Sequence, residues 1–258
     1  MIVTDSKVIQ LYQQNYSLSQ IATLCKKSRG TITKVLLSHN IPIRDNNAYK
    51  QKQCNYDFFH NITSEAQAYW LGYVWGDGAI SKNNTNFVIK IGIQDKEHLE
   101  LFKCHLNSEH KLGVYTNHSG FINGNQFCQL SIISEQMCND LLQYGVCNPK
   151  VNRTIPNLSQ ELIPHFIRGY FDADGSYTQR KGNGGLISFC GPPSIIIQIQ
   201  KLIQQYCNTQ ANIYYYKNRN AADYRIGGMN DIRMLYELMY QNATVYLQRK
   251  KDKFNIGE

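Results

Sequence analysis

The chain has 258 residues, which is enough for one large domain or for two to three small ones. Hydrophobic residues make up 42% of the sequence, so it can bury a core and is not that of a disordered protein. A formal net charge of +8 favours a polyanionic partner such as nucleic acid, although ordinary surface variation also produces such a charge. The sequence has no run of about 18 apolar residues, so no membrane span is expected.

The first ten residues, MIVTDSKVIQ, lack the basic start and the apolar run of a signal peptide. We therefore expect a protein that is not secreted and that works in the cytoplasm, in an organelle or in a phage-infected host cell. The eight cysteines include no C-x-x-C pair, which argues against a structural zinc site. Without a secretory signal, they are expected to be reduced and mostly buried.

Residues 1–45 predict a separate small helical module. Short amphipathic helices are expected over 7–14 and after a capping segment at 17–19, and a third helix over 30–39. Two short helices joined by a tight turn are typical of a helix-turn-helix, and the module resembles the DNA-binding unit of resolvases and invertases. A plain three-helix packing unit is the alternative. The residues expected to face DNA are Arg29, Thr31, Thr33 and Lys34.

A polar linker is expected over 46–62, followed by two similar halves at 63–157 and 158–258. In each half the hydrophobic periodicity predicts a helix, two strands, a helix, two strands and a closing helix. The first helix of each half ends in Asp-Gly, at Asp77 and again at Asp174, 97 residues later (174 − 77). The predicted fold class is α+β, with two pseudo-symmetric αββαββα halves packed through these helices and a small all-α module before them.

Paired small residues precede both Asp-Gly sequences. Residues four positions apart share one face of a helix, and small residues there let two helix backbones approach closely. If the two faces meet, Asp77 and Asp174 become neighbours. The small residues are Gly72 with Gly76 in the first half, and Gly169 with Ala173 in the second.

Two neighbouring carboxylates at helix C-termini are electrostatically unfavourable. Each meets the negative end of its own helix dipole, at a cost of about 0.3–1 kcal/mol, and the two repel one another. A hard divalent cation relieves this repulsion, and oxygen ligands favour Mg²⁺, or a similar ion such as Mn²⁺. Such ions, held between carboxylates and a phosphate oxygen, are the usual apparatus of phosphodiester hydrolysis. A single Asp-Gly after a helix is more often a simple cap, so the duplication is what favours a metal site.

A lysine follows each Asp-Gly at a similar distance. Lys150 lies 73 residues after Asp77 (150 − 77), and Lys250 lies 76 residues after Asp174 (250 − 174). A lysine near the metal can offset charge on the reacting phosphate or orient the attacking water. Contact with the DNA backbone, or a solvated basic run, is the alternative.

The segments WLGYVWGDG (70–78) and IRGYFDADG (167–175), with their flanks, resemble the two copies of the LAGLIDADG motif in phage- and intron-encoded homing endonucleases. The resemblance covers about residues 60–255. It implies two halves packed through the motif helices, each with a curved sheet that lies in the DNA major groove. The first copy departs from the motif at Trp75, where the second has Asp172, but this position is not the metal ligand.

The same resemblance implies roles for individual residues. It implies that Asp77 and Asp174 bind the catalytic Mg²⁺, and that Lys150 and Lys250 assist the water network. It also assigns Asp95 to a polar position near the metal in the first half. The corresponding segment of the second half, 190–194, offers no equivalent residue. We therefore expect an asymmetric site.

Strand alternation gives a first estimate of the side chains that face DNA, although several of them fit an ordinary solvent-facing position equally well. These residues are Lys90, Gln129, Gln179, Lys217 and Arg225.

The predicted function is site-specific DNA cleavage of the homing type, with Mg²⁺, on both strands of a long double-stranded target. The chain is expected to act as a monomer that forms an internal pseudo-dimer. A non-catalytic transcription regulator and an RNA maturase on the same fold are the alternatives. Regulators of that kind lose the acid pair and carry their helix-turn-helix after the two halves rather than before them. An intein is not expected, since the chain starts with Met1 and ends without His-Asn.

Overall fold

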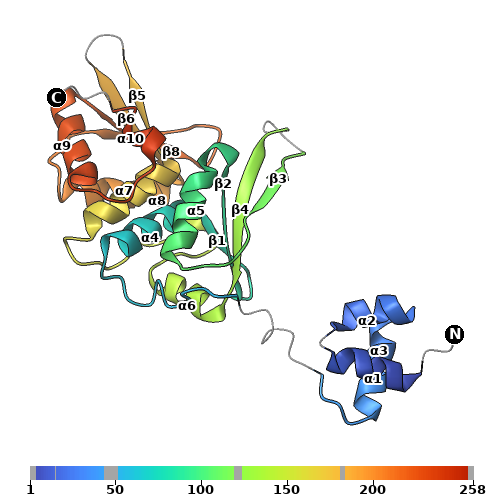
Figure 1. Ribbon diagram of the computed structural model, residues 1–258. Helices are drawn as coiled ribbons and strands as arrows, with labels where there is room; N and C mark the ends of the chain where they lie inside the picture. Colours follow the sequence, from blue (N-terminus) through green and yellow to red (C-terminus); the bar gives the residue numbers. More distant parts are fainter. Residues whose placement is uncertain (1–3, 15, 44–51, 119–123, 181–183, 255–258) are drawn as a thin grey trace. The chain divides into compact units, whose positions relative to one another are not determined.

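A computed structural model describes residues 4–14, 16–43, 52–118, 124–180 and 184–254 (Figure 1). The chain divides into two compact units, Met1–Gln51 and Lys52–Glu258, and each is described here by itself. Of the linker expected over 46–62, residues 46–51 lie outside the described residues. Residues 52–62 belong to the second unit, because Phe58 and Phe59 are buried in its core.

The first unit is a three-helix module. Ser17 caps α2 with a capping box completed by Gln20, and Ser28 caps α3 by accepting a hydrogen bond from the Thr31 backbone. Lys26 adopts a left-handed backbone conformation (φ 51°) at the end of α2, which turns the chain toward α3. The helices are α1 (Asp5–Gln13), α2 (Leu18–Cys25) and α3 (Arg29–Ser38).

The second unit contains the two expected αββαββα halves, and this fold class is confirmed. The first half comprises α4 (Glu65–Asp77), β1 (Gly78–Ile80), β2 (Asn86–Gly92), the 3₁₀ turn η1 (Ile93–Asp95), α5 (Lys96–His105), β3 (Gly113–Thr116), β4 (Gln126–Ile133), α6 (Glu135–Gln143) and η3 (Lys150–Asn152). The second comprises α7 (Ile163–Asp174), β5 (Gly175–Gln179), β6 (Gly185–Gly191), α8 (Pro193–Gln204), β7 (Asn212–Tyr215), β8 (Ala222–Gly227), α9 (Met229–Tyr240) and α10 (Gln248–Lys251).

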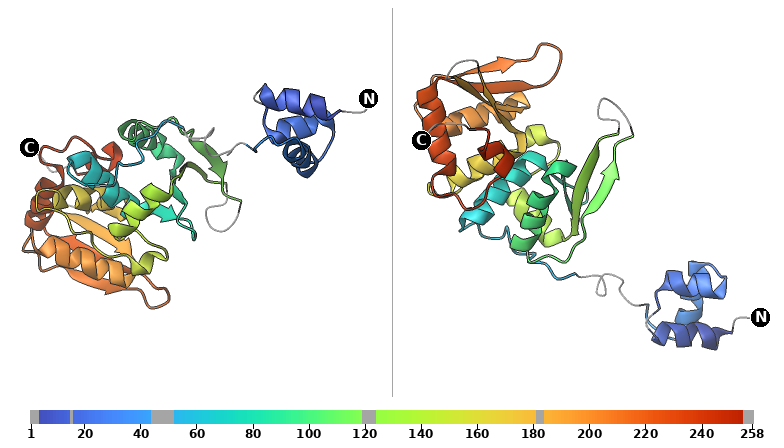
Figure 2. Two further views of the ribbon diagram at one scale, coloured as in Figure 1. Left: turned by 90° about the horizontal axis from the view of Figure 1, so that it is seen from below. Right: turned by 45° about the horizontal axis from the view of Figure 1, so that its top comes forward.

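The two sheets have the same topology. Their strand orders are β1-β2-β4-β3 and β5-β6-β8-β7, and all neighbouring strands are antiparallel. The views in Figures 1 and 2 place α4 and α7 side by side between the two sheets. One hydrophobic core cluster runs through both halves, so the second unit is a single packed body.

The central helices cross at small residues, as the sequence predicts. A Cβ atom on Gly72 would overlap the backbone carbonyl of Phe166, and one on Gly169 would overlap that of Tyr69. Glycine at these two positions therefore lets the backbones of α4 and α7 touch. One turn later, a Cβ on Gly76 would overlap the Cβ of Ala173.

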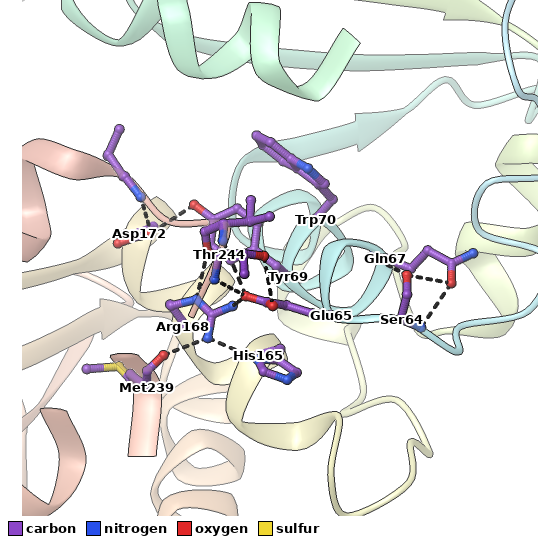
Figure 3. Close-up of polar contacts among 12 residues, drawn as sticks. Ser64, Glu65, Gln67, Tyr69, Trp70, His165, Arg168, Asp172, Met239 and Thr244 are labelled. Atoms are coloured by element: carbon purple, nitrogen blue, oxygen red, sulfur yellow. Dashed lines mark hydrogen bonds and ion pairs between the residues drawn. The ribbon is translucent and has the colours of Figure 1, made fainter. Parts of the chain in front are cut away.

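A buried polar cluster ties the two halves together near the start of α4 (Figure 3). The fully buried Arg168 of α7 donates to Glu65 of α4 (2.6 Å) and to the carbonyl groups of Met239 (2.6 Å) and Val245 (2.8 Å). Glu65 also accepts hydrogen bonds from the backbone and hydroxyl of Thr244. Because Arg168 is paired and hydrogen-bonded, its charge is tolerated away from water.

In the part of the chain that the structure describes, none of the helices has the length and the apolar character needed to cross a bilayer. Among the eight cysteines, Cys25, Cys128, Cys138 and Cys207 are buried, whereas Cys104 and Cys190 are exposed. The expectation that the thiols are mostly buried therefore holds for only half of them.

Candidate active site

The crossing of the motif helices brings the two aspartates to the same end of the pair. Asp77 is the last residue of α4 and Asp174 is the last residue of α7. A Cβ on Gly76 would lie 3.3 Å from Asp174 Oδ2, which shows how closely this carboxylate approaches the opposite helix. Burial, together with the charge of Asp174, raises the pKa of Asp77 to about 7.

The donor set of this pair fits a hard divalent cation. In the part of the chain that the structure describes, the Asp77 carboxylate receives no hydrogen bond and forms no ion pair. A partly buried carboxylate without a partner is costly, and a cation beside it removes that cost. The described residues include no group of three or more His, Cys, Asp or Glu side chains arranged to hold a metal, so this site offers two protein carboxylates.

Lys150 reaches the pair from the end of the first half. Its Nζ forms an ion pair with Oδ2 of Asp174, which belongs to the second half. Both side chains are partly exposed, at 27% for Lys150 and 23% for Asp174. The predicted proximity of Lys150 to the acid pair is therefore present, and its contact crosses between the halves.

Lys250 lies differently. It is buried, and its Nζ donates to the carbonyl groups of Phe171 (2.9 Å), Ala173 (3.3 Å) and Gly175 (2.7 Å) at the C-terminal end of α7. Burial lowers the pKa of Lys250 to about 8. Its charge meets the negative end of the helix dipole, so Lys250 satisfies the last carbonyls of the motif helix.

The structural counterpart of Lys250 is Arg153, rather than Lys150 as the spacing suggested. Arg153 is buried and donates to the carbonyls of Trp75, Gly76 (3.3 Å) and Gly78 (2.6 Å) at the end of α4. The separation of Arg153 and Lys250 is 97 residues (250 − 153), the same as that of the two aspartates. This repeat offset was available in the sequence, and applying it to the basic residues identifies Arg153.

Asp95 is held in place by the other half. Its carboxylate accepts two hydrogen bonds of 2.5 Å from Nε and Nη2 of Arg249, which directly precedes Lys250. Asp95 ends η1, and the second half passes from β6 to α8 without such a turn, so the predicted lack of a counterpart agrees with the structure. The hydroxyl of the buried Tyr170 has no hydrogen-bond partner among the described residues, and it lies 3.2 Å from an ideal Cβ built on Gly191.

Asp172, at the position where the first motif has Trp75, serves the fold. It is buried and accepts hydrogen bonds from Tyr69 (2.8 Å), the Leu247 backbone (2.7 Å) and Tyr240 (3.2 Å). Burial raises its pKa to about 6. In the first half, Trp75 donates to the Thr154 carbonyl (3.1 Å). The inner motif position therefore anchors the segment that closes each half.

The sheets place the residues that were predicted to face DNA unequally. Strand pairing sets Lys90 opposite Gln129, and both belong to the open face of the first sheet, with Lys90 exposed. Beside them a hollow of about 600 Å³ lies between the end of β2 and the β3–β4 hairpin. Its polar lining is mostly amide: Gln94, Asn117, Asn125 and Gln126.

On the second sheet only Arg225 lies on the open face of a strand. Gln179 follows the inward-facing Tyr177 by two residues, so the open face of β5 is carried by Ser176 and Thr178 instead. Lys217 is exposed, but it lies in the loop between β7 and β8. Gln179 is the last residue of β5 and shares the side of Tyr177, whereas Lys217 lies beyond the end of β7, so alternation does not place either of them on the open face.

The first unit presents its predicted residues on α3. Arg29 and Lys34 are exposed, whereas Thr31 and Thr33 are partly buried. The Thr31 hydroxyl lies 2.9 Å from that of the capping Ser28, so this residue has a role at the helix start.

Comparison with known proteins identifies the fold. No protein-family model matches the sequence. A segment of 157 residues is 28% identical to an uncharacterized protein of Methanocaldococcus jannaschii; it covers 59% of this chain and only 57% of that relative. Among solved structures, the I-LtrWI LAGLIDADG homing endonuclease bound to target DNA matches with a TM-score of 0.51 at 13% identity, over 77% of this chain and 88% of the other.

The meganuclease I-SmaMI bound to uncleavable DNA matches with a TM-score of 0.50 at 10% identity, over 74% of this chain and 88% of that structure. The second unit has the LAGLIDADG fold. The N-terminal LAGLIDADG domain of the protein DUF199/WhiA is also found, with a TM-score of 0.46 and 17% identity over 72% of this chain and 89% of that one.

Sequence reasoning missed the partners of the predicted residues more often than the residues themselves. Arg153, Arg249 and Asp223 were not singled out. Arg153 has a signal in the 97-residue offset, whereas the other two become visible only through contacts made by distant segments or adjacent strands.

Proposed function

We propose that the chain is a site-specific, metal-dependent DNA endonuclease that hydrolyses both strands of a double-stranded target as a monomer. The observation that carries this proposal is the pair of carboxylates, Asp77 and Asp174, at the adjoining ends of two helices that touch through glycine. The LAGLIDADG fold and the basic charge of the chain support it.

The residues at and around the carboxylate pair would have different roles in this reaction. Asp77 and Asp174 would hold Mg²⁺, with the remaining ligands drawn from phosphate oxygens and water, as is usual for this ion. When bound, the ion would supply Lewis-acid stabilisation of charge on the scissile phosphate. Lys150, which already neutralises Asp174, is placed to offset charge on the phosphate between the halves. Arg153 and Lys250 hold the ends of the two motif helices and thereby fix the separation of the aspartates.

The structural support for catalysis over a purely binding role is the retention of both acids without a compensating partner for Asp77. A protein that only binds DNA has no use for a carboxylate beside the phosphate backbone, because it repels the phosphates. The buried residues of α4 end at Gly76 and those of α7 end at Asp172, so neither terminal acid is part of the fully buried core and packing does not require a charged side chain there.

The test is to change each acid to its amide. Asp77→Asn and Asp174→Asn are each expected to reduce Mg²⁺-dependent double-strand cleavage by roughly a hundred- to a thousand-fold, while DNA binding persists. The site is first obtained by cleavage selection on a randomised library with the unmodified chain. Binding to the selected site is measured by gel shift, and cleavage of the same site is measured separately with Mg²⁺. Full cleavage by both single variants would rule out the proposed metal site, and binding without cleavage by the unmodified chain would favour a regulator.

A further inference from the structure

The second sheet carries a polar cluster on its open face that the proposed chemistry does not use. The cluster consists of Tyr214, Tyr216, Asp223 and Arg225. Strand pairing places Cys190 opposite Asp223 and Ser188 opposite Arg225, on the face that alternates with the buried Tyr224 and Ile226. It therefore lies on the side of the sheet away from the core.

The cluster holds one guanidinium in a fixed orientation. Nη2 of Arg225 donates to Asp223 Oδ2 (2.8 Å) and to the Tyr216 hydroxyl (3.2 Å). Nε of Arg225 also donates to Asp223 Oδ2 (3.2 Å). Tyr216 in turn donates to Asp223 Oδ2 at 2.5 Å. The Arg225 guanidinium also lies over the ring of Tyr214, 4.7 Å from its centre.

The two side chains of the Asp223–Arg225 ion pair differ in their exposure to solvent. The Asp223 side chain is 9% exposed, whereas that of Arg225 is 34% exposed. Partial burial would raise the Asp223 pKa, but the hydrogen bonds from Tyr216 and Arg225 outweigh it and hold the pKa below its ordinary value. The carboxylate is thus ionised and covered, and the arginine is the group presented to solvent.

Stability does not account for this arrangement. An ion pair at the solvent-facing surface contributes little to folding, and covering an aspartate on an open sheet face has a desolvation cost. What the carboxylate does achieve is to fix the rotamer of a long, flexible side chain, so that less conformational entropy is lost when the arginine binds a partner.

A held arginine on an open antiparallel face fits one base edge in particular. Guanine presents two adjacent acceptors, N7 and O6, in the major groove, and arginine is the side chain that matches them. Nε and Nη2 of Arg225 are engaged by Asp223 and Tyr216, whereas Nη1 has no hydrogen-bond partner among the described residues, so the two N–H groups of Nη1 are the donors presented to a base. A backbone phosphate would accept hydrogen bonds from the same N–H groups, so the experiment has to distinguish a guanine contact from a phosphate contact.

The described residues of the first sheet form no such cluster. Gly78 pairs with Ile89 and Gly175 pairs with Phe189, so the residues that follow, Lys90 and Cys190, occupy equivalent positions. The partner of Lys90 is Gln129, which makes Gln129 the counterpart of Asp223. By the same pairing, Ser131 is the counterpart of Arg225, and its hydroxyl lies 2.9 Å from Asn86 Oδ1. The first half therefore presents an amide and a hydroxyl where the second half presents a supported arginine.

We propose that Arg225, oriented by Asp223 and Tyr216, reads a guanine in the part of the DNA target that the second half contacts. This inference rests on the proposed function and deepens it, since it gives one of the two half-sites a defined base. At the position equivalent to Arg225 the first half has Ser131 rather than a cation, so it imposes no guanine there.

The experiment is a binding selection with the full chain on a randomised double-stranded DNA library at fixed salt, followed by titration of the selected site. The unmodified chain is expected to require guanine at one position of one half-site. Arg225→Ala is expected to weaken binding by roughly 5- to 150-fold to sites with that guanine and to leave the preferences at other positions unchanged. Arg225→Lys keeps the charge but loses the guanidinium that Asp223 and Tyr216 orient, so the same preference should weaken. Asp223→Asn should relax it at that position alone.

Lys217→Ala is the matched control, because it removes one positive charge from the adjacent exposed loop. It should weaken binding to all sequences equally and lower the dependence on salt by about one counterion. The same behaviour in Arg225→Ala would show a phosphate contact and overturn the inference, as would an unchanged selection. Circular dichroism confirms that each variant is folded, and Arg225→Lys tests the point should the alanine variant unfold. An unmodified chain that selects no DNA refutes the proposed function itself, whereas selection without a guanine requirement refutes only the role of Arg225.

Discussion

The two halves of the second unit are alike in how the ends of their motif helices are capped, and they differ in the residues around the two carboxylates. Each motif helix ends with unpaired carbonyl groups that point into the protein, and each end is covered by a buried cation from the segment closing its half. Arg153 covers α4 and Lys250 covers α7, at equivalent positions in the repeat. Here the backbone sets the requirement, and because both helices have it, both halves keep a basic residue.

Around the carboxylates the halves diverge. Lys150 pairs with Asp174, but the residue 97 positions later (247 − 150) is the apolar Leu247, whose backbone donates to Asp172. Asp95 is held by Arg249, and the second half has no equivalent aspartate. The open sheet faces differ as well. Symmetry is thus kept where both helix ends need a cation, and lost around the carboxylates and on the open sheet faces.

The largest expected effect breaks the part that both halves share. Gly169→Ala places a methyl group against the Tyr69 carbonyl, and Gly72→Ala does the same at Phe166. Because backbone rather than a flexible side chain lies in the way, each variant should lose about 3 kcal/mol or more of unfolding free energy. Gly30→Ala, in α3, is the control, since its nearest neighbour lies 3.8 Å away and alanine favours helix there. Chemical denaturation measures all three, and equal stabilities would show that the helices do not cross at these residues.

The second prediction separates the capping residues from Lys150. Arg153→Met and Lys250→Met leave several buried carbonyls without a donor, so each should destabilise the protein by about 2–4 kcal/mol. Lys150→Met removes a partly exposed side chain and should leave the melting temperature nearly unchanged.

The same variants are then compared in cleavage of a supercoiled plasmid that carries the selected site. Lys150→Met should slow the cutting of one strand by about a hundred-fold, so that nicked circles accumulate. Because Leu247 occupies the equivalent position, no second lysine compensates. Linear product forming at the normal rate would show that Lys150 serves only to hold Asp174.

The third prediction concerns pH in the absence of metal. The Asp77 pKa is raised to about 7 by burial and by Asp174, so the folded state binds a proton that the unfolded state releases above its lower pKa. The contribution of this group to stability is complete below pH 4 and is lost as the pH rises through 7. Asp77→Asn should flatten this dependence and stabilise the metal-free protein at pH 8 by on the order of 2 kcal/mol, a discounted share of 1.36 kcal/mol per pKa unit. Thermal melts from pH 4 to 8 with a chelator test it, and parallel curves for the two proteins would contradict it.

The smallest effect sharpens the contrast between the two units. Replacing Arg29 and Lys34 of α3 together by alanine should weaken DNA binding uniformly and lower the salt slope by about two, since each exposed cation contacts about one phosphate. The rate of cleavage at saturating enzyme should not change. Deletion of residues 1–45 should act in the same direction, and an unchanged slope would show that this unit makes no phosphate contact.

Much of the fold follows from the sequence because its signals are local. The sequence pattern over 229–240 predicts a helix and that over 126–133 predicts a strand, and the structure has α9 (Met229–Tyr240) and β4 (Gln126–Ile133) there. Ser64 and Gln67 have the S-x-x-Q spacing of a capping box, and in the structure they form one at the start of α4. The acid pair is also predictable from the sequence. The spacing of Gly72 and Gly76, repeated at Gly169 and Ala173, predicts a close helix contact with both aspartates at the same end of the two helices.

The sequence by itself determined the elements, the repeat and the two carboxylates, because periodicity, caps and small-residue spacing act over a few residues. Only the tertiary structure decided which charged groups pair. Arg249 pairs with Asp95, 154 positions away in the chain, and Lys150 pairs with Asp174 of the opposite half. Lys250 caps the C-terminal end of α7. Such pairings depend on the superposition of distant segments, for which the local sequence carries no signal, and they set the asymmetry on which the proposed chemistry and the proposed guanine contact depend.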